Sequence, residues 1–160
     1  MGQPGQTASA AEEDAGTMSL VFRAGSLLCA LRLDDVIETM RPLGTRPLAG
    51  TPAFVRGVSI VRGVPTPVVD VARLLGDEQA QAARFVAVRT ERGSVAFATG
   101  PVLGIRSTTV DAGARHARLL GAVGQLVAGV GTLDAEPLLL LQSMRVVPDE
   151  VWAAAAGGSS

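Results

Sequence analysis

The stretch TPAFVRGVSIVRGVPTPVVDV, residues 51–71, contains two apolar runs that are separated by one short break. The first run spans residues 54–61, the second continues from residue 64 to residue 75, and Arg62 and Gly63 lie between them. Glycine adopts the positive φ that a tight turn requires at no steric cost. The stretch therefore predicts two strands joined by a turn, with Arg62 projecting outward from that turn.

Other parts of the chain repeat this pattern. Residues 127–130 read Val-Ala-Gly-Val and echo the Val-Arg-Gly-Val of residues 55–58, and Pro137 leads an apolar run as Pro67 does. A strand–turn–strand segment at residues 20–33 returns at residues 84–98, so the copies are offset by about 64 to 72 residues, with a short deletion in the second. Two such units are too few for a solenoid, and a sheet closed on itself has no exposed edges. The repeat predicts an all-β chain of two small barrels packed side by side, with few short helical turns.

The second copy is expected to begin near residue 84. Between the first hairpin and residues 51–71, Asp34 is placed to cap a brief helical turn over residues 36–38. Residues 1–17 and 148–160 are predicted to be tails, so the folded domain is expected to span residues 18–147. The start of the chain lacks the basic and apolar regions of a signal peptide. The longest uncharged apolar run, residues 119–133, is shorter than the roughly 20 residues a bilayer needs, which predicts a soluble protein.

Charge and cysteine content restrict the partners and the compartment. The net charge is −1, with acidic and basic residues scattered along the chain, so no basic stripe is present to bind nucleic acid. Cys29 is the only cysteine and lies in an apolar stretch, where we expect a buried thiol that acts as a small hydrophobic group. A single cysteine forms no intrachain disulfide, which fits a reducing cytoplasm.

Residues that could support catalysis or hold a cofactor are nearly absent. His116 is the only histidine, and no acid or nucleophile lies at motif spacing from it, so a solvated surface residue is expected there. Metal sites need several histidines, cysteines or clustered carboxylates. The glycine-rich segments match neither phosphate-binding pattern, and the chain contains no lysine. The sequence predicts no enzymatic activity, no metal and no cofactor.

Two interpretations of Arg62 remain open. In the first, Arg62 is a turn arginine that is solvated or forms an ion pair, with Asp70 as a candidate partner. In the second, its guanidinium is held outward beside apolar valines and prolines, which is the composition of an anchor residue in a protein interface.

Residues 51–71 closely resemble the signature of CheW-like chemotaxis coupling domains. That signature has a P-x-F-[IV]-x-G-V segment, then N-L-R-G, then a strand that ends in P-[IV]-[IV]-D-[LV]. Weaker similarity extends over roughly residues 18–147, where Val36 and Glu38 fit the family's Val-x-Glu and residues 85–104 and 126–141 resemble its second half. One position departs, because Ile60 stands where the family usually has an asparagine that bonds to local backbone.

The resemblance implies two SH3-like five-stranded β-barrels around a common hydrophobic core. It also implies a cytoplasmic, non-enzymatic adaptor that links the cytoplasmic tip of methyl-accepting chemoreceptors to the regulatory domain of a CheA-type histidine kinase, with no nucleic acid partner and no direct insertion into a membrane. By the same matching, Gly57, Gly63, Pro67 and Asp70 are expected to be structural. The residues implied as partner contacts are Val36, Glu38, Arg56, Val58, Arg62, Val102 and Leu103.

Two alternatives stay beside the coupling adaptor. One is a divergent structural component of a receptor array that does not couple to the kinase. The other is a small-ligand-binding β-barrel with its ligand in a cleft between the two halves, which requires several converging polar groups.

Overall fold

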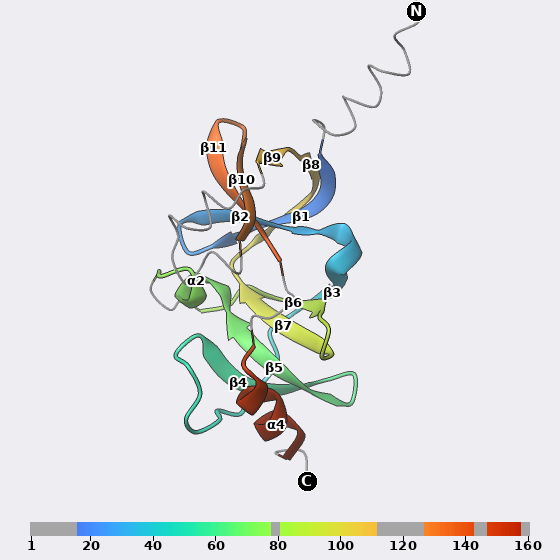
Figure 1. Cartoon of the computed structure of the whole chain (residues 1–160), viewed down its shortest axis with the longest axis vertical. Helices are drawn as coiled ribbons and strands as arrows, with labels where there is room; N and C mark the ends of the chain where they lie inside the picture. Colours follow the sequence, from blue (N-terminus) through green and yellow to red (C-terminus); the bar gives the residue numbers. More distant parts are fainter. Residues whose placement is uncertain (1–15, 78–80, 112–126, 143–146, 158–160) are drawn as a thin grey trace, which may run out of the picture.

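A computed structural model describes residues 16–77, 81–111, 127–142 and 147–157, which form two β-sheets (Figure 1). Sheet A has the strand order β8-β1-β2-β11-β10-β9 and sheet B the order β3-β6-β7-β5-β4. The strands of sheet A are β1 (Thr17–Ala24), β2 (Leu27–Arg32), β8 (Val102–Thr108), β9 (Val110–Asp111), β10 (Val127–Leu133) and β11 (Glu136–Leu141). The strands of sheet B are β3 (Val36–Met40), β4 (Val55–Val61), β5 (Val64–Asp70), β6 (Arg84–Arg89) and β7 (Ser94–Thr99).

This architecture confirms the predicted all-β chain built from two β subdomains. Sheet A lies in the upper part of Figure 1 and sheet B in the lower part. Sheet B has the expected five strands, while sheet A has a sixth, the two-residue β9. The first described strand begins at Thr17.

Several strands are buried on both faces, which explains why their sequences show runs of apolar residues in place of alternation. In β1, Leu20 and Phe22 face the cluster between the sheets, while Val21 faces a separate cluster formed by sheet A alone. The same division holds in β11, where Leu141 joins the first cluster and Leu140 the second. The unbroken leucine run of β11 therefore reflects burial on two sides.

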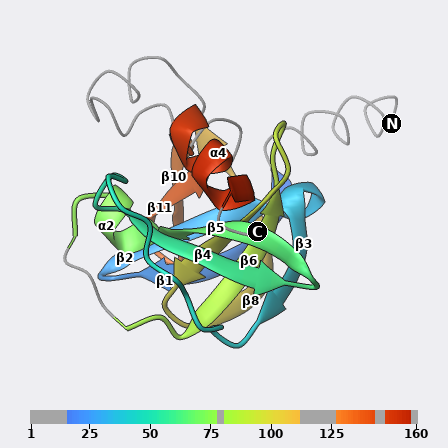
Figure 2. The same ribbon diagram turned by 90° about the horizontal axis from the view of Figure 1, so that it is seen from below.

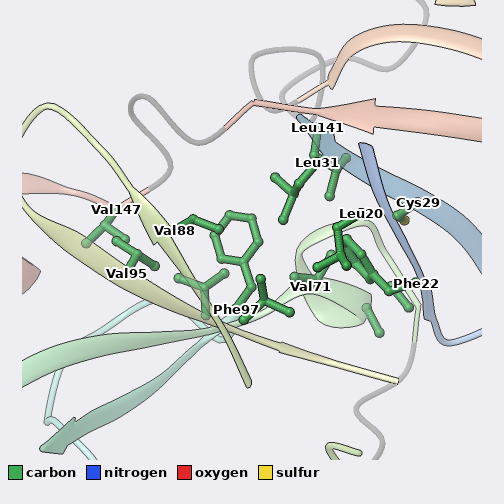
Figure 3. Close-up of a cluster of buried hydrophobic side chains, with 14 of the residues drawn as sticks. Leu20, Phe22, Cys29, Leu31, Val71, Val88, Val95, Phe97, Leu141 and Val147 are labelled. Carbon is green, nitrogen blue, oxygen red and sulfur yellow. The ribbon is translucent and has the colours of Figure 1, made fainter. Parts of the chain in front are cut away.

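The two sheets share a hydrophobic core. Figure 3 shows Leu20, Phe22 and Leu31 of sheet A on one side and Phe97 of β7 on the other, with the Phe97 ring between them. Phe22, Leu31 and Phe97 have no solvent exposure. At about 1.5–3 kcal/mol for each large apolar side chain buried, this shared cluster holds the two sheets together as one unit.

The sheets do not follow the two halves of the sequence. Each sheet joins a hairpin from the first copy of the repeat to a hairpin from the second: β2 pairs in parallel with β11, and β5 pairs in parallel with β7. The single strands are exchanged as well, since β3 pairs with β6 and β8 pairs with β1. The second copy does begin at Arg84 with β6, but the two copies are interleaved in space.

The register corrects the alignment of the two copies. In β4–β5, Gly57 lies opposite Val68 and Ile60 opposite Pro65; in β10–β11, Gly129 lies opposite Leu140 and Thr132 opposite Pro137. One offset of 72 residues thus relates the whole of both hairpins, with no deletion. Pro137 corresponds to Pro65, and not to Pro67 as the sequence pattern indicated.

Helices are few. A 3-10 turn spans Leu33–Asp35 and α2 spans Val71–Leu74. The helical turn expected over residues 36–38 is wrong, because these residues begin β3 and Val36 pairs with Val88 of the neighbouring strand. Pairing with β6 satisfies the backbone there, so the turn ends before Val36.

The C-terminal segment differs from the expected tail. Residues Asp149–Gly157 form the helix α4, which lies against sheet B over β5 (Figure 2). Val151 and Ala155, four residues apart and so on one helix face, are each only 2% exposed. Docking of this face, and not intrinsic stability, explains a helix of this length, since isolated helices so short are marginal in water. None of the described helices is long and apolar enough to cross a membrane.

Candidate functional site

The tip of the β4–β5 hairpin is a two-residue turn in which Arg62 (φ 52°) and Gly63 (φ 79°) both have positive φ. Positive φ at both central residues defines a type I′ turn, whose twist matches that of the flanking strands. Gly63 adopts this conformation freely, whereas Arg62 adopts it at some steric cost. The turn therefore holds Arg62 at the outer end of the hairpin, with 77% of its side chain exposed.

Arg62 binds Glu38 through two parallel hydrogen bonds. Its Nε donates to Oε2 at 2.9 Å and its Nη2 donates to Oε1 at 2.7 Å. β3, which carries Glu38, and β4 are the two outer strands of sheet B, so the ion pair brings the edges of the sheet together and helps to close the barrel. The hydrogen bonds from Arg62 lower the pKa of Glu38 and raise that of Arg62. Both groups are therefore charged at neutral pH.

Asp70 is bonded to Arg56, which decides between the two ion-pair possibilities for the turn. Nε and Nη2 of Arg56 donate to Oδ2 of Asp70 at 3.0 and 2.8 Å, while Oδ1 accepts from the backbone N–H of Arg73 and caps α2. The Asp70 side chain is 3% exposed and the Arg56 side chain 19%. The candidate pairing of Arg62 with Asp70 is therefore wrong, since Asp70 is held inside by Arg56.

The structure divides the residues predicted as partner contacts into three places. Glu38 and Arg62 meet in the ion pair, and Arg56 is held by Asp70. Val58, half-buried on β4, is bridged to Arg46 on its outer side, with both backbone hydrogen bonds at 2.8 Å. The remaining three residues lie at β-bulges.

The two bulges occupy corresponding positions in the two copies. One lies between Val36 and Glu38 in β3, and the other distorts β8 at Leu103, where Val102 and Gly104 pair with neighbouring residues of β1. A bulge turns an extra side chain out of the ladder. Leu103 is accordingly 53% exposed, and Ile37 at the β3 bulge is 42% exposed.

A further exposed apolar area adjoins Leu103. Met18 of β1 is 51% exposed and Ile105 of β8 is 52% exposed. Met18 lies opposite Ser107, two residues from Ile105, so the two side chains are diagonal neighbours on one face of sheet A. We call Met18, Leu103 and Ile105 the β8 apolar surface.

Sequence reasoning missed Val64, Ile37, Met18 and Ile105 as surface residues, and it noted Ile60 without assigning it to the site. In β4 a signal was available, because Val55, Gly57, Ser59 and Val61 are buried in strict alternation. That alternation places Ile60 on the outward face, where it is 58% exposed. For β8 the bulge breaks the alternation, so no comparable signal was present.

The described residues offer little for catalysis. They contain no group of three or more histidine, cysteine or acidic residues that could hold a metal ion. Cys29 is fully buried, and burial raises the pKa of its thiol to about 12, so it stays protonated and unreactive. His116 lies outside the described residues, as do residues 1–15 of the expected N-terminal tail.

Two cavities flank α4, and neither lies at the junction of the sheets. One, of about 360 Å³, lies between α4 and residues 49–52; the other, of about 350 Å³, lies between α4, the start of β5 and the turn that contains Gly93. The junction of the two sheets is filled by the shared apolar core. The cleft that the small-ligand alternative requires is therefore not formed by these core residues.

Comparisons with known proteins agree with this architecture. The family model described as the CheW-like domain matches residues 19–151. Protein FrzA of Myxococcus xanthus is 34% identical over 116 residues, which cover 64% of this chain and 71% of FrzA. The crystal structure of the scaffolding protein TtCheW from Thermoanaerobacter tengcongensis superimposes with a TM-score of 0.68 over 81% of this chain and 90% of that chain, at 17% identity.

Proposed function

The chain belongs to the CheW-like domain family, and from this premise we propose that it couples methyl-accepting chemoreceptors to a CheA-type histidine kinase. Members of this family are scaffolds of chemotaxis-type signalling and not enzymes. A scaffold acts by holding two partners at once, so it needs two separate binding surfaces. The question for this chain is where those surfaces lie.

The observation that carries the proposal is that exposed apolar side chains gather in two places, one on each sheet. The tip of β4–β5 in sheet B presents Arg62 beside Ile60 and Val64, which are 58% and 56% exposed. The β8 apolar surface lies on sheet A. Contiguous exposed apolar groups on a small protein mark interaction sites. Two partners bound to different sheets do not compete for the same residues.

We assign the kinase to the β4–β5 tip and the receptor to the β8 apolar surface. A guanidinium held outward beside apolar side chains is a frequent anchor in protein interfaces. The receptor tip is helical in the family, and a helix docks by laying an apolar face on an apolar surface of the β8 kind. Both partners act in the cytoplasm, so the chain works there, attached to the receptor array through them.

A charge reversal at Arg62 tests the kinase assignment. Arg62→Glu places two carboxylates together at the tip and removes the anchor, so we expect capture of the purified kinase regulatory domain to fall at least about thirtyfold, the effect of losing an anchor of roughly 2 kcal/mol. Pull-down and calorimetric titration measure the loss. Thermal unfolding checks that the variant stays folded.

The double variant Glu38→Arg with Arg62→Glu is the matched control. It restores an ion pair between β3 and the turn but leaves the outward charge reversed. We expect its unfolding to match the wild type while kinase capture stays lost. If the double variant regained capture, Arg62 would act only by closing the barrel, and the assignment of the tip as a kinase contact would be abandoned.

Activation of the kinase separates coupling from a purely structural place in the array. Receptor signalling complexes reconstituted with this chain should show raised kinase autophosphorylation, and Ile105→Asp on the β8 apolar surface should abolish it while kinase capture persists. Assembly of the complexes without any rise in autophosphorylation would favour the structural array component.

A further inference from the structure

We propose that Ile60, Val64 and the adjoining cavity beside α4 form an apolar docking surface for the kinase's regulatory domain and determine which kinase the chain accepts. The inference rests on the proposed function and extends it from the turn to a larger surface. We call Ile60, Val64 and Pro65 the hairpin apolar surface.

The hairpin apolar surface lies at an open edge of sheet B. Ile60 is paired with Pro65, and Val64 with Val61, in the last two rungs before the turn. β4 is the outermost strand, and the bridge to Arg46 covers it only at Val58. A proline has no N–H, so the Ile60 backbone groups cannot form a full bonded pair with it and point away from β5. A partner therefore has access to both the side chain and the backbone of Ile60.

The apolar surface continues onto α4. The cavity of about 350 Å³ is lined by Val64 and Pro65 on one side and by Trp152 and Ala155 of α4 on the other. This volume is at the small end of the range for binding pockets, enough for one or two side chains. Trp152 is half-buried and lies against Gly93, where a Cβ would come within 3.5 Å of its ring. Trp152 thus forms a fixed aromatic wall.

The charged groups around this surface are already paired. Arg62 is bound by Glu38 at the hairpin tip, and Arg92 at the rim of the cavity is bound by Asp149. An apolar centre surrounded by satisfied polar groups is the anatomy of a protein–protein interface. A small charged ligand would find no free charge in this rim, whereas an apolar protein segment would bury its side chain without separating an ion pair.

The equivalent hairpin shows that the fold does not require these residues. Thr132 corresponds to Ile60 and Glu136 to Val64 at the constant offset of 72 residues. Thr132 is exposed, and the β10–β11 hairpin forms with the same register. Two large apolar side chains exposed only on β4–β5 therefore serve a contact outside this chain. That contact is continuous with Arg62, the proposed kinase anchor.

The test replaces polarity at constant shape. Ile60→Thr and Val64→Thr keep the β-branched side chains that favour strands and lose the apolar character. For the double variant we expect affinity for the purified regulatory domain of the CheA-type kinase encoded in the same genome to fall about tenfold or more, measured by calorimetry. Ile105→Thr is the matched control, because Ile105 is 52% exposed on sheet A, and it should leave kinase affinity unchanged.

A second variant tests the cavity independently. Ala156 is an exposed α4 residue at the cavity, and Ala156→Phe should fill it without disturbing the core. We expect weakened kinase binding with unchanged thermal unfolding.

The outcomes separate the two proposals. If the wild-type chain does not bind the kinase domain at all, the proposed function itself fails. If the wild type binds and both the Thr double variant and Ala156→Phe bind equally well, the docking surface is wrong while the proposed function stands. If the Thr variant instead loses receptor binding, or loses self-association measured by sedimentation, the kinase is the wrong occupant.

Discussion

The hairpins β4–β5 and β10–β11 follow the same path and end in the same kind of turn, with positive φ at Arg62 and Gly63 in one and at Asp134 and Ala135 in the other. Their tips carry opposite charge. Arg62 reaches Glu38 on β3, whereas Asp134 reaches Arg106 on β8 at 3.5 Å. Each ion pair joins a hairpin tip to an outer strand of its own sheet, so both sheets are closed by the same device with the signs reversed.

The second hairpin is tied down more firmly. Besides Asp134, its Glu136 forms a two-pronged ion pair with Arg23 of β1, with one of the bonds at 2.8 Å. At the position of Glu136 the first hairpin has Val64, which is 56% exposed. The comparison teaches that one copy of the repeat uses its tip to hold the chain together, while the other leaves apolar side chains free for a partner.

Breaking the polar anchor of the first copy should have the largest effect. Asp70→Ala leaves the Arg56 guanidinium without its buried partner and removes the cap of α2, so we expect a loss of about 3 kcal/mol or more in the free energy of unfolding. Urea denaturation measures it. Gln142 holds the equivalent position in the second copy, and Gln142→Ala should cost less than about 1 kcal/mol. Equal losses would mean that the two copies are anchored alike.

Exchanging the turn residues should have an intermediate effect. Ala135 has a φ of 67°, a conformation that costs a non-glycine residue about 1 kcal/mol, and its counterpart is Gly63. Ala135→Gly should therefore stabilise the protein by up to about 1 kcal/mol, and Gly63→Ala should destabilise it by a similar amount. Shifts of the urea midpoint at constant slope check both. A destabilised Ala135→Gly would show that the alanine side chain makes a contact worth more than the strain.

Acid should act on the tether of the second hairpin with the smallest effect. The hydrogen bonds from Arg23 lower the pKa of Glu136 below its ordinary 4.5. A carboxyl whose pKa is lowered on folding stabilises the native state above pH 4.5, and this contribution disappears as the pH falls through the lower, folded-state pKa. The side chains of Arg23 and Glu136 are 34% and 38% exposed, so solvent screens the pair.

Glu136→Gln should remove this acid-dependent component. Melting temperatures of the variant and the wild type should differ slightly at neutral pH and converge at low pH. A difference that stays constant across the whole range would mean that Glu136 acts through packing and not through its charge.

Local features of the site were predictable from neighbouring residues. The Arg62-Gly63 turn, the strands around it and the outward position of Arg62 follow from turn chemistry and apolar runs within a few residues. Glu38 and Arg62 were each predicted as contact residues, but not as partners of one another, because 24 residues separate them and only barrel closure brings them together. For the same reason the sequence offered Asp70 to Arg62, when the chain instead places Arg56 against it.

The amino-acid sequence by itself determined the β class, the two copies and the hairpins within each copy, because turn geometry and strand burial act over short spans of chain. Tertiary structure decided how the copies interleave: β2 pairs with β11 and β5 with β7, which buries both faces of these strands. It also decided that residues 149–157 form a helix, since Val151 and Ala155 become buried only when sheet B is present to receive them. Pairing between distant strands depends on the total apolar area that the whole chain buries, and no local pattern of residues specifies that sum.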